Sequence, residues 1–344
     1  MSKALPTELT AAQAISYYSG DEWEIFVAEL VEGLSADSAY VLVKRMGGPG
    51  DLGIDIAGFK SSQGFEASWD GYQCKQYAKP LSPAAAWVEI LKVIRAVVAE
   101  ECVMPEAYIF MAPKGVGLSL NKLLRQPSKA KLEFSKWLQD HNPTPAMSPL
   151  ERASVEKQMS ETDFSIFDAM QPREIITLHS KTRYHSLRFS TPLPDRNVTV
   201  PDDIGGLTGE EARYVDQLVA VYQQRHPDDI LTRETVAEHP AKGTHFRRQR
   251  RAFFRAETLR VYARESTPPG TFEDLQSDLH AGVIEVADND HADGYARVQS
   301  VLSESGKIDL ANHRLVEKTD HEDRKGICHQ LVNDERLTWI DGTQ

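Results

Sequence analysis

The stretch GGPGDLGIDIAGF, residues 47–59, decides the fold of the N-terminal half, and YQCKQ follows at 72–76. Its glycines and Asp51 are typical of a tight turn, and its apolar second half predicts a strand. AYVLVKRM (39–46) predicts a strand before the turn, and YQCKQ predicts another after it. The sequence therefore predicts a meander of three strands. Asp51 is assigned to the turn, although a role in positioning a substrate stays open.

The second predicted strand has two different sides, because side chains alternate between the faces of a strand. Gly53, Asp55 and Ala57 share one side, while Ile54 and Ile56 share the other. The isoleucines are expected to anchor the strand in the core. Asp55, flanked by two very small residues, is then free to approach a hydrated metal ion.

The same alternation on the third strand places Gln73 and Lys75 together and turns Cys74 away. If the second and third strands are neighbours, Asp55 joins them, so that an acidic ligand, a neutral oxygen ligand and an ammonium converge. Mg²⁺ prefers oxygen ligands, and it both activates water and stabilises charge on a phosphate. Lys75 would orient or deprotonate the attacking water, or stabilise the transition state. The pattern indicates phosphodiester hydrolysis with Mg²⁺ or Mn²⁺.

A second acidic ligand is predicted on the helix before the first strand. Ser19 and Glu22 form a possible capping box ahead of an apolar stripe: Trp23, Phe26, Val27, Leu30, Val31 and Leu34. At about 100° per residue, Glu24 lies at the border of this stripe, whereas Glu29 and Glu32 rotate toward solvent. Glu24 is therefore the candidate ligand. The alternative is a solvated helix glutamate.

The rest of the N-terminal half alternates helices and a strand. Apolar spacing predicts helices at 84–98, 128–142 and 150–170, and a strand at 107–113. The predicted fold class is α/β, with a mixed sheet flanked by helices.

The strongest candidate for a linker is TPLPDRNVTVPDDIGG, residues 191–206, which combines prolines, glycines and turn formers. A length of 344 residues also favours two domains. The predicted domains are residues 1–190, which carry the sheet, and residues 207–344, whose segments are mainly helical.

The composition limits the possible functions. The chain carries 39 Lys and Arg against 51 Asp and Glu, a net charge of −12. This charge argues against a free-standing nucleic-acid binder of high affinity, because phosphate affinity comes mostly from cations. The three cysteines show no disulfide or zinc pattern, and no segment is apolar enough to cross a membrane. We expect a cytoplasmic protein without a membrane partner, in which any DNA contact uses local basic patches.

One basic patch is predicted on a helix at 242–264. On that helix Arg247, Arg248, Arg251 and Arg255 fall within an arc of about 100°. The face could hold DNA phosphates or an acidic partner. The alternative is a solvated face paired with local acids.

Together, the GGPGDLGID turn, Asp55, the QCK of the third strand and a WE pair on the first helix resemble the PD-(D/E)xK restriction-endonuclease-like superfamily, in particular its Mrr-like branch. The resemblance implies a metal-dependent nuclease with a restriction-endonuclease-like fold. Carried over by motif position, it implies that Asp55 and Gln73 are metal ligands, that Lys75 is catalytic and that Glu24 assists.

The tail DRKGICHQLVNDERLTWI (323–340) is similar to the C-terminal region of effector subunits in Lamassu-type, ABC-three-component anti-phage systems. This resemblance implies a nuclease held inactive by an SMC-like ATPase and a small third subunit. It further implies activation by release and self-assembly into a homo-oligomer that cuts double-stranded DNA with little sequence specificity.

Two other functions stay open. One is an Mrr-type restriction endonuclease whose second domain reads DNA. The other is a non-catalytic adaptor that binds DNA or a partner, although the intact set of Asp55, Gln73 and Lys75 argues against it.

Overall fold

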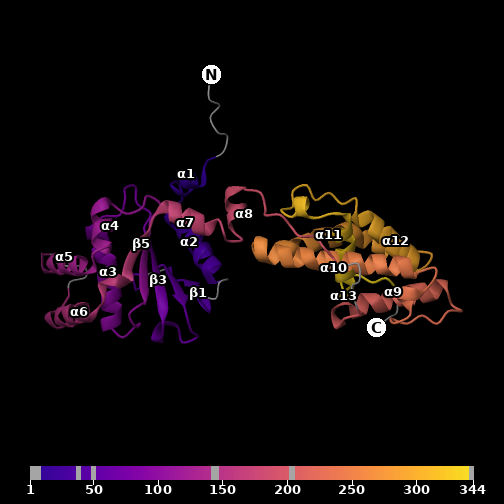
Figure 1. Cartoon of the computed structure of the whole chain (residues 1–344), viewed down its shortest axis with the longest axis horizontal. Coiled ribbons are helices and arrows are strands. Elements are labelled where there is room, and N and C mark those ends of the chain that lie inside the picture. The colour runs from indigo at the N-terminus through magenta and orange to yellow at the C-terminus, as the bar shows by residue number, and fades with distance from the viewer. Residues whose placement is uncertain (1–8, 36–39, 48–51, 141–146, 201–205, 341–344) are drawn as a thin grey trace, which may run out of the picture. The chain divides into compact units, whose positions relative to one another are not determined.

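The chain divides into two compact units, Met1–Thr191 and Pro192–Gln344. Figure 1 shows the computed structural model, in which the described residues are 9–35, 40–47, 52–140, 147–200 and 206–340. Asp51, predicted to form the turn, lies outside the described residues.

A five-stranded mixed sheet forms the centre of the N-terminal unit (Figure 1). Its strands, in spatial order, are β1 (Leu42–Arg45), β2 (Ile56–Phe59), β3 (Trp69–Cys74), β4 (Ala107–Met111) and β5 (Phe167–Met170). The first three pair antiparallel, with Ile56 opposite Tyr72, and β4 and β5 continue the sheet in parallel. The predicted mixed sheet and the pairing of the second and third strands are therefore confirmed.

Helices cover both faces of this sheet. One face shares a core that contains Trp23 and Ile56, and its helices are α1 (Ala11–Ile15), α2 (Gly20–Ser35), α7 (Pro172–His179) and α8 (His185–Phe189). The other face shares a core that contains Ile54 and Trp87, and its helices are α3 (Pro83–Val98), α4 (Leu118–Leu124), α5 (Pro127–Asp140) and α6 (Pro149–Glu161). The chain crosses from β3 to the parallel β4 through α3.

The prediction of one helix over 150–170 is wrong in its second half. After α6 ends at Glu161, a 3₁₀ turn over Phe164–Ile166 leads into β5 beside β4. A strand of four residues leaves too short an apolar pattern to be told from the end of a helix. Parallel pairing with β4 decides its conformation.

The prediction that Ile54 and Ile56 share one side is also wrong. Ile54 packs in the core under α3, while Ile56 packs in the core under α2. Strand alternation does not yet apply at Ile54, because Gly53 has a left-handed φ of 74° and strand pairing begins at Ile56. A Cβ at Gly53 would lie 2.7 Å from the Cβ of Lys92, so this glycine lets α3 approach the residues before β2.

The C-terminal unit is helical, as predicted, and its longer helices are α9 (Ala212–Arg225), α10 (Gly243–Ser266), α11 (Thr271–Asp288), α12 (Gly294–Ser305) and α13 (His321–Asn333). The backbones of α10 and α13 touch, since a Cβ at Gly326 would collide with the carbonyl oxygen of Ala252. Among the described residues of both units, no helix has the length and apolar character needed to cross a bilayer.

Residues 192–200, within the predicted linker, form an extended segment of the C-terminal unit. Arg196 in this segment is buried, and its guanidinium donates to the buried carboxylate of Asp323 at 2.6 and 2.9 Å. It also donates to the carbonyl of Arg255 and to the hydroxyl of Thr258, at 2.7 and 2.8 Å. A buried charge with this many partners holds the segment against α10 and α13.

A chain of hydrogen bonds crosses the core of this unit. The Trp339 indole nitrogen donates to Nδ1 of His329 (3.3 Å), whose Nε2 lies 3.2 Å from Oε1 of Gln249. The Gln249 amide nitrogen lies 3.2 Å from Nε2 of His245, whose Nδ1 lies 2.7 Å from the hydroxyl of Tyr222. Because an indole can only donate, every group in the chain is satisfied only when both histidines are neutral.

Candidate active site

Asp55 lies directly before β2, where its carboxylate reaches the end of β3. It is 7% exposed, and its Oδ2 accepts hydrogen bonds from the backbone amide of Cys74 (2.6 Å) and from Nε2 of Gln73. Its own amide donates to the carbonyl of Tyr72 at 3.2 Å. The two strands predicted to be neighbours thus bring Asp55 and Gln73 into direct contact.

Gln73 is sealed from solvent, and Tyr108 of β4 holds its other side. The Tyr108 hydroxyl lies 3.0 Å from Oε1 of Gln73 and 2.5 Å from the carbonyl oxygen of Gly53. Gln73 therefore presents its amide nitrogen to Asp55 and its oxygen to Tyr108. The amide orientation matters for the predicted metal role, because only the oxygen can bind a cation.

Lys75 follows β3 directly, and its backbone amide extends the pairing with β4 by donating to the carbonyl of Met111 at 2.8 Å. Its Nζ lies 3.2 Å from Oε1 of Glu89, a carboxylate on α3 whose side chain is only 6% exposed. The other oxygen of Glu89 accepts from Nζ of Lys92 at 3.0 Å. The predicted catalytic lysine is thus one half of a buried ion pair.

Glu89 is the residue of this site that the sequence analysis missed. It lies on a face of α3 that is otherwise apolar, among the buried residues Ala86, Ile90 and Val93. Carboxylates are almost never buried without a partner. The sequence signal for this residue is an acid within the apolar stripe of a helix. Such an acid indicates a buried cation partner, but it does not identify which lysine provides the cation.

Glu24 lies on α2 with its side chain 25% exposed, and it faces β1. Its Oε2 accepts from Nε of Arg45 at 3.0 Å, a partner that the sequence analysis did not identify. The pKa of the Cys74 thiol is raised well above its usual range, first by burial and then by the carboxylates of Asp55 and Glu24. Both acids therefore lie near the Cys74 thiol, while hydrogen bonds hold Asp55 to Gln73 and Cys74 and hold Glu24 to Arg45.

The expectation that Glu29 points to solvent is wrong. Its carboxylate is 18% exposed and accepts two hydrogen bonds from Arg188, at 2.7 and 2.6 Å, and it lies 3.3 Å from His179. Glu32 is exposed, as expected, and accepts from the hydroxyl of Tyr184 at 2.5 Å. The segment after β5 covers this side of α2, which no pattern within the helix reveals.

The Asp55 carboxylate at the end of β3 suits a hard divalent cation such as Mg²⁺, while the amide oxygen of Gln73 faces Tyr108 and the Glu24 carboxylate accepts from Arg45. Among the described residues, the acidic groups here do not form a set of three within 4.8 Å of one another. Mg²⁺ usually keeps several waters and takes only one or two protein carboxylates. The site suits an ion completed by water and phosphate oxygens.

A second group of metal-type ligands, His226, Asp229 and His239, lies in the C-terminal unit. Hydrogen bonds account for it without an ion. Nδ1 of His239 accepts from the amide of Lys242 at 3.1 Å, so Nε2 carries the hydrogen and donates to Asp229 at 2.9 Å. If Nε2 of His239 bound a metal ion, the ring hydrogen would have to sit on Nδ1. That position already accepts the backbone N–H of Lys242, so the two hydrogens would clash.

The four arginines of the predicted basic face all lie on α10, but they differ in their contacts. Arg247, Arg248 and Arg251 are exposed. The side chain of Arg255 is 14% exposed and forms ion pairs with acids at the start of α13: Asp320, Glu322 and Asp323. Arg255 is therefore a contact within the unit, and the exposed part of the face consists of the other three.

Comparison with known families finds a match in the C-terminal unit. Residues 211–339, which span α9 to α13, match the family model CTD6, the C-terminal domain 6 of the ABC-three component (ABC-3C) systems. The match covers less than half of the chain. No curated protein and no solved structure matches the chain. On the family match, this chain is a component of an ABC-three component anti-phage defence system, and residues 211–339 are similar to C-terminal domain 6 of such systems.

Proposed function

We propose that this chain is a Mg²⁺-dependent DNA endonuclease and the nuclease effector of its ABC-three component system. One observation carries the proposal. Asp55 and Gln73 are in direct contact where the start of β2 adjoins the end of β3, and Lys75, two residues after Gln73, pairs with the buried carboxylate of Glu89. Phosphodiester hydrolysis needs oxygen ligands for a cation and a positive group beside the phosphate, and this arrangement supplies both.

Each side chain then has a role. Asp55, Glu24 and Gln73 would hold the metal ion, which supplies an activated water and neutralises charge on the phosphate. Lys75, paired with Glu89, acts as an ammonium that orients the water or stabilises charge developing on the phosphate. Glu89 is a positioning residue, because it holds the ammonium and does not itself touch the substrate.

The hydrogen bonds of Gln73 support a metal-dependent change of its amide. With the amide nitrogen toward Asp55, the Tyr108 hydroxyl donates to Oε1 of Gln73. With the amide reversed, Tyr108 accepts from the amide nitrogen and donates to the carbonyl of Gly53. The reversed amide points its oxygen at Asp55, which is repulsive unless a cation lies between the two oxygens. Tyr108 can bond the amide in both orientations, but its single hydrogen is free for the Gly53 carbonyl only in the reversed one.

A cleavage assay tests the proposal. Purified protein, alone and with the other subunits of its system, is incubated with plasmid DNA and Mg²⁺ or a chelator. We expect Mg²⁺-dependent cleavage that Lys75→Ala lowers by at least about 100-fold. Lys79→Ala, at a nearby exposed lysine, is the matched control. Undiminished cleavage by Lys75→Ala would contradict the site, and no cleavage by any assembly would favour the adaptor.

The family match supports the assembly part of the proposal, because a three-component system implies partner subunits. We propose that an SMC-like ATPase and a small third subunit hold the nuclease inactive, and that release lets it form a homo-oligomer on double-stranded DNA. The net charge of −12 supports this order of events, since it weakens DNA binding by one copy. Several copies on one duplex would add their weak contacts. Sequence-specific cleavage by the isolated chain would favour an Mrr-type restriction enzyme instead.

A further inference from the structure

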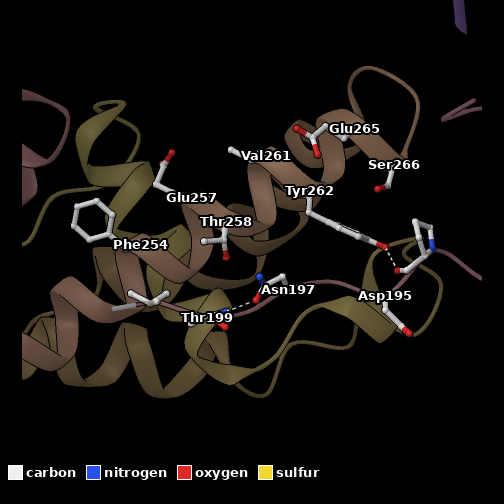
Figure 2. A pocket seen from close by; sticks show the side chains of 12 residues that line it. Asp195, Asn197, Thr199, Phe254, Glu257, Thr258, Val261, Tyr262, Glu265 and Ser266 are labelled. Carbon is white, nitrogen blue, oxygen red and sulfur yellow. Dashed lines mark hydrogen bonds between the residues drawn. The ribbon is translucent and has the colours of Figure 1, made fainter. Parts of the chain in front are cut away.

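The C-terminal unit contains an open groove of about 720 Å³, shown in Figure 2. One wall is α10 from Phe254 to Ser266, and the other is the extended segment from Pro194 to Val200. We infer that this groove binds an amphipathic helix of a partner subunit, with an apolar face and Lys or Arg at both ends.

The shape of the groove suits a helix. Phe254, Thr258, Val261 and Tyr262 stand at positions i, i+4, i+7 and i+8, so they line one face of α10 (Figure 2). The wall from Phe254 to Ser266 runs for about 18 Å at 1.5 Å per residue, which matches roughly three turns of a docked helix. Val261, near the middle, is 43% exposed although it is apolar. Helix-in-groove recognition uses anchors with this spacing.

The second wall is fixed before any partner binds. The Tyr262 hydroxyl donates to the carbonyl of Pro194 at 2.6 Å, a bond drawn in Figure 2. Two residues further on, Arg196 is buried in its ion pair with Asp323. A preformed groove avoids the entropic cost of ordering this segment on binding, which favours affinity.

The charges of the groove identify the chemistry of its occupant. Its charged lining residues are all acidic: Glu257 lies beside Phe254 at one end, and Asp195 and Glu265 lie toward the other (Figure 2). Each of these acids forms an ion pair with a cation outside the lining: Glu257 with Arg260, Glu265 with Arg264 at 3.8 Å, and Asp195 with Lys318 at 3.4 Å. Asp195 and Glu265 are exposed, so their pairs are weak and leave both carboxylates accessible to a docked cation. An apolar floor between acidic ends favours an apolar helix with basic ends. It disfavours nucleic acid, and the net charge of −12 disfavours a second copy of this chain.

The identity of the partner comes from the family match, which places this domain in a system of three components. The inference rests on that match and not on the nuclease proposal, so either can fail without the other. A chain that cleaves no DNA could still bind its partner through this groove.

The test is assembly of the complex from its own subunits. The tagged chain is co-expressed with the two other subunits of its system, as wild type and as Val261→Arg or Glu265→Lys. The first change places a long cation in the apolar floor, and the second reverses one acidic end. The matched controls are Ile230→Arg, at an apolar residue that is 89% exposed, and Glu285→Lys, at an exposed acid on α11. Neither control lines the groove.

We expect each groove variant to lower the recovered partner by about tenfold or more, while both controls stay within about twofold of wild type. Thermal melting and light scattering confirm that the variants are folded and report their oligomeric state. If Val261→Arg fails to fold, Glu265→Lys, which changes an exposed residue, still tests the inference. Full recovery of the partner by the folded variants overturns the inference. Loss of self-association with the partner retained also overturns it, because the groove would then serve a second copy.

Overlapping peptides from the two partner subunits, tested for binding to the purified full chain, locate the occupant. We expect a peptide with apolar residues at i, i+3 or i+4, and i+7 and with basic residues at both ends. Binding of that peptide should be lost with Glu265→Lys and kept with Glu285→Lys. A bound peptide that is acidic, or whose binding ignores Glu265→Lys, contradicts the assignment.

Discussion

The carboxylate of Glu89 lies 3.2 Å from the ammonium of Lys75, and the two side chains are only 6% and 17% exposed. Breaking a buried ion pair leaves one charge without a partner, which is strongly unfavourable. This relationship ties the proposed catalytic lysine to α3. It makes the helix that joins β3 to β4 a part of the site as well as a part of the core.

Glu89→Gln is therefore expected to lower Mg²⁺-dependent DNA cleavage by about 10- to 100-fold, because the Lys75 ammonium loses the charge that positions it. Lys75→Ala and the double variant should be about equally impaired, since a positioning residue has no effect without the group it positions. Lys92→Ala, which leaves Glu89 in contact with Lys75, is the control. Losses that multiply in the double variant would show that Glu89 acts independently of Lys75.

Tyr108→Phe is expected to raise the Mg²⁺ concentration that gives half-maximal cleavage. The variant removes the hydroxyl that satisfies the Gln73 amide and the Gly53 carbonyl, so Gln73 is no longer held for either orientation. It should also cost about 1–3 kcal/mol of stability, because buried polar groups lose a partner. Tyr77→Phe, at an exposed tyrosine close in sequence, is the control. An unchanged Mg²⁺ concentration at half-maximal cleavage would show that Tyr108 does not contribute to metal binding.

The C-terminal unit is expected to lose stability in acid through His245 and His329. Burial lowers the pKa of His245 to about 4, with the nearby cations of Arg248, Lys242 and Lys325 as further causes. Burial also lowers the pKa of His329 to about 3. In the unfolded chain both would titrate near about 6.5. The two neutral histidines thus contribute their full stabilisation of the C-terminal unit above about pH 6.5. This stabilisation is lost progressively as the pH falls toward about 3.

Hydrogen exchange of the α10 and α13 amides measures this loss, with protection compared between about pH 7 and about pH 4.5. His329→Gln can still accept from Trp339 and donate to Gln249, but it cannot be protonated. This variant should be less stable than wild type at neutral pH, and its protection should fall less in acid. An equal fall in both proteins would exclude His329 as a source of the pH dependence.

Gly326→Ala is expected to destabilise the C-terminal unit by several kcal/mol or to prevent its folding. The new methyl group would collide with the carbonyl oxygen of Ala252, and the backbones of two packed helices would have to separate. Gly209→Ala is the matched control, because a Cβ there meets nothing within 4 Å. Urea denaturation gives both free energies. Similar values for the two variants would contradict the backbone contact between α10 and α13.

The arginines of α10 are expected to separate into two classes. Arg255→Ala should lower stability, because it leaves the acids at the start of α13 without their cation. Arg248→Ala, at an exposed arginine, should leave stability within about 0.5 kcal/mol. If this face binds DNA, this variant should reduce the salt dependence of binding by about one contact. Thermal melting and DNA binding at several salt concentrations measure the two effects.

Much of the N-terminal fold follows from local pattern. Ser19 and Glu22 form the predicted capping box, with bonds of 2.7 and 3.2 Å, and the apolar stripe of α2 is buried from Trp23 to Val31 and half-buried at Leu34. Asp55 and Gln73 could be paired from sequence because they adjoin on two neighbouring antiparallel strands, although the predicted alternation fails one residue earlier, at Ile54. β5 could not be found in this way, because its four residues become a strand only by pairing with β4.

The amino-acid sequence by itself predicted that Asp55, Gln73 and Lys75 lie at the adjoining ends of two neighbouring strands, because strand order and short-range spacing bring these positions together. Only the tertiary structure decided what surrounds them. It placed Glu89 against Lys75, Arg45 against Glu24 and Arg196 against Asp323. These pairs join residues on different elements. For the buried charges of Glu89, Arg196 and Asp323, burial selects the partner, since a charge removed from water must be met by another. No local period in the chain encodes that choice.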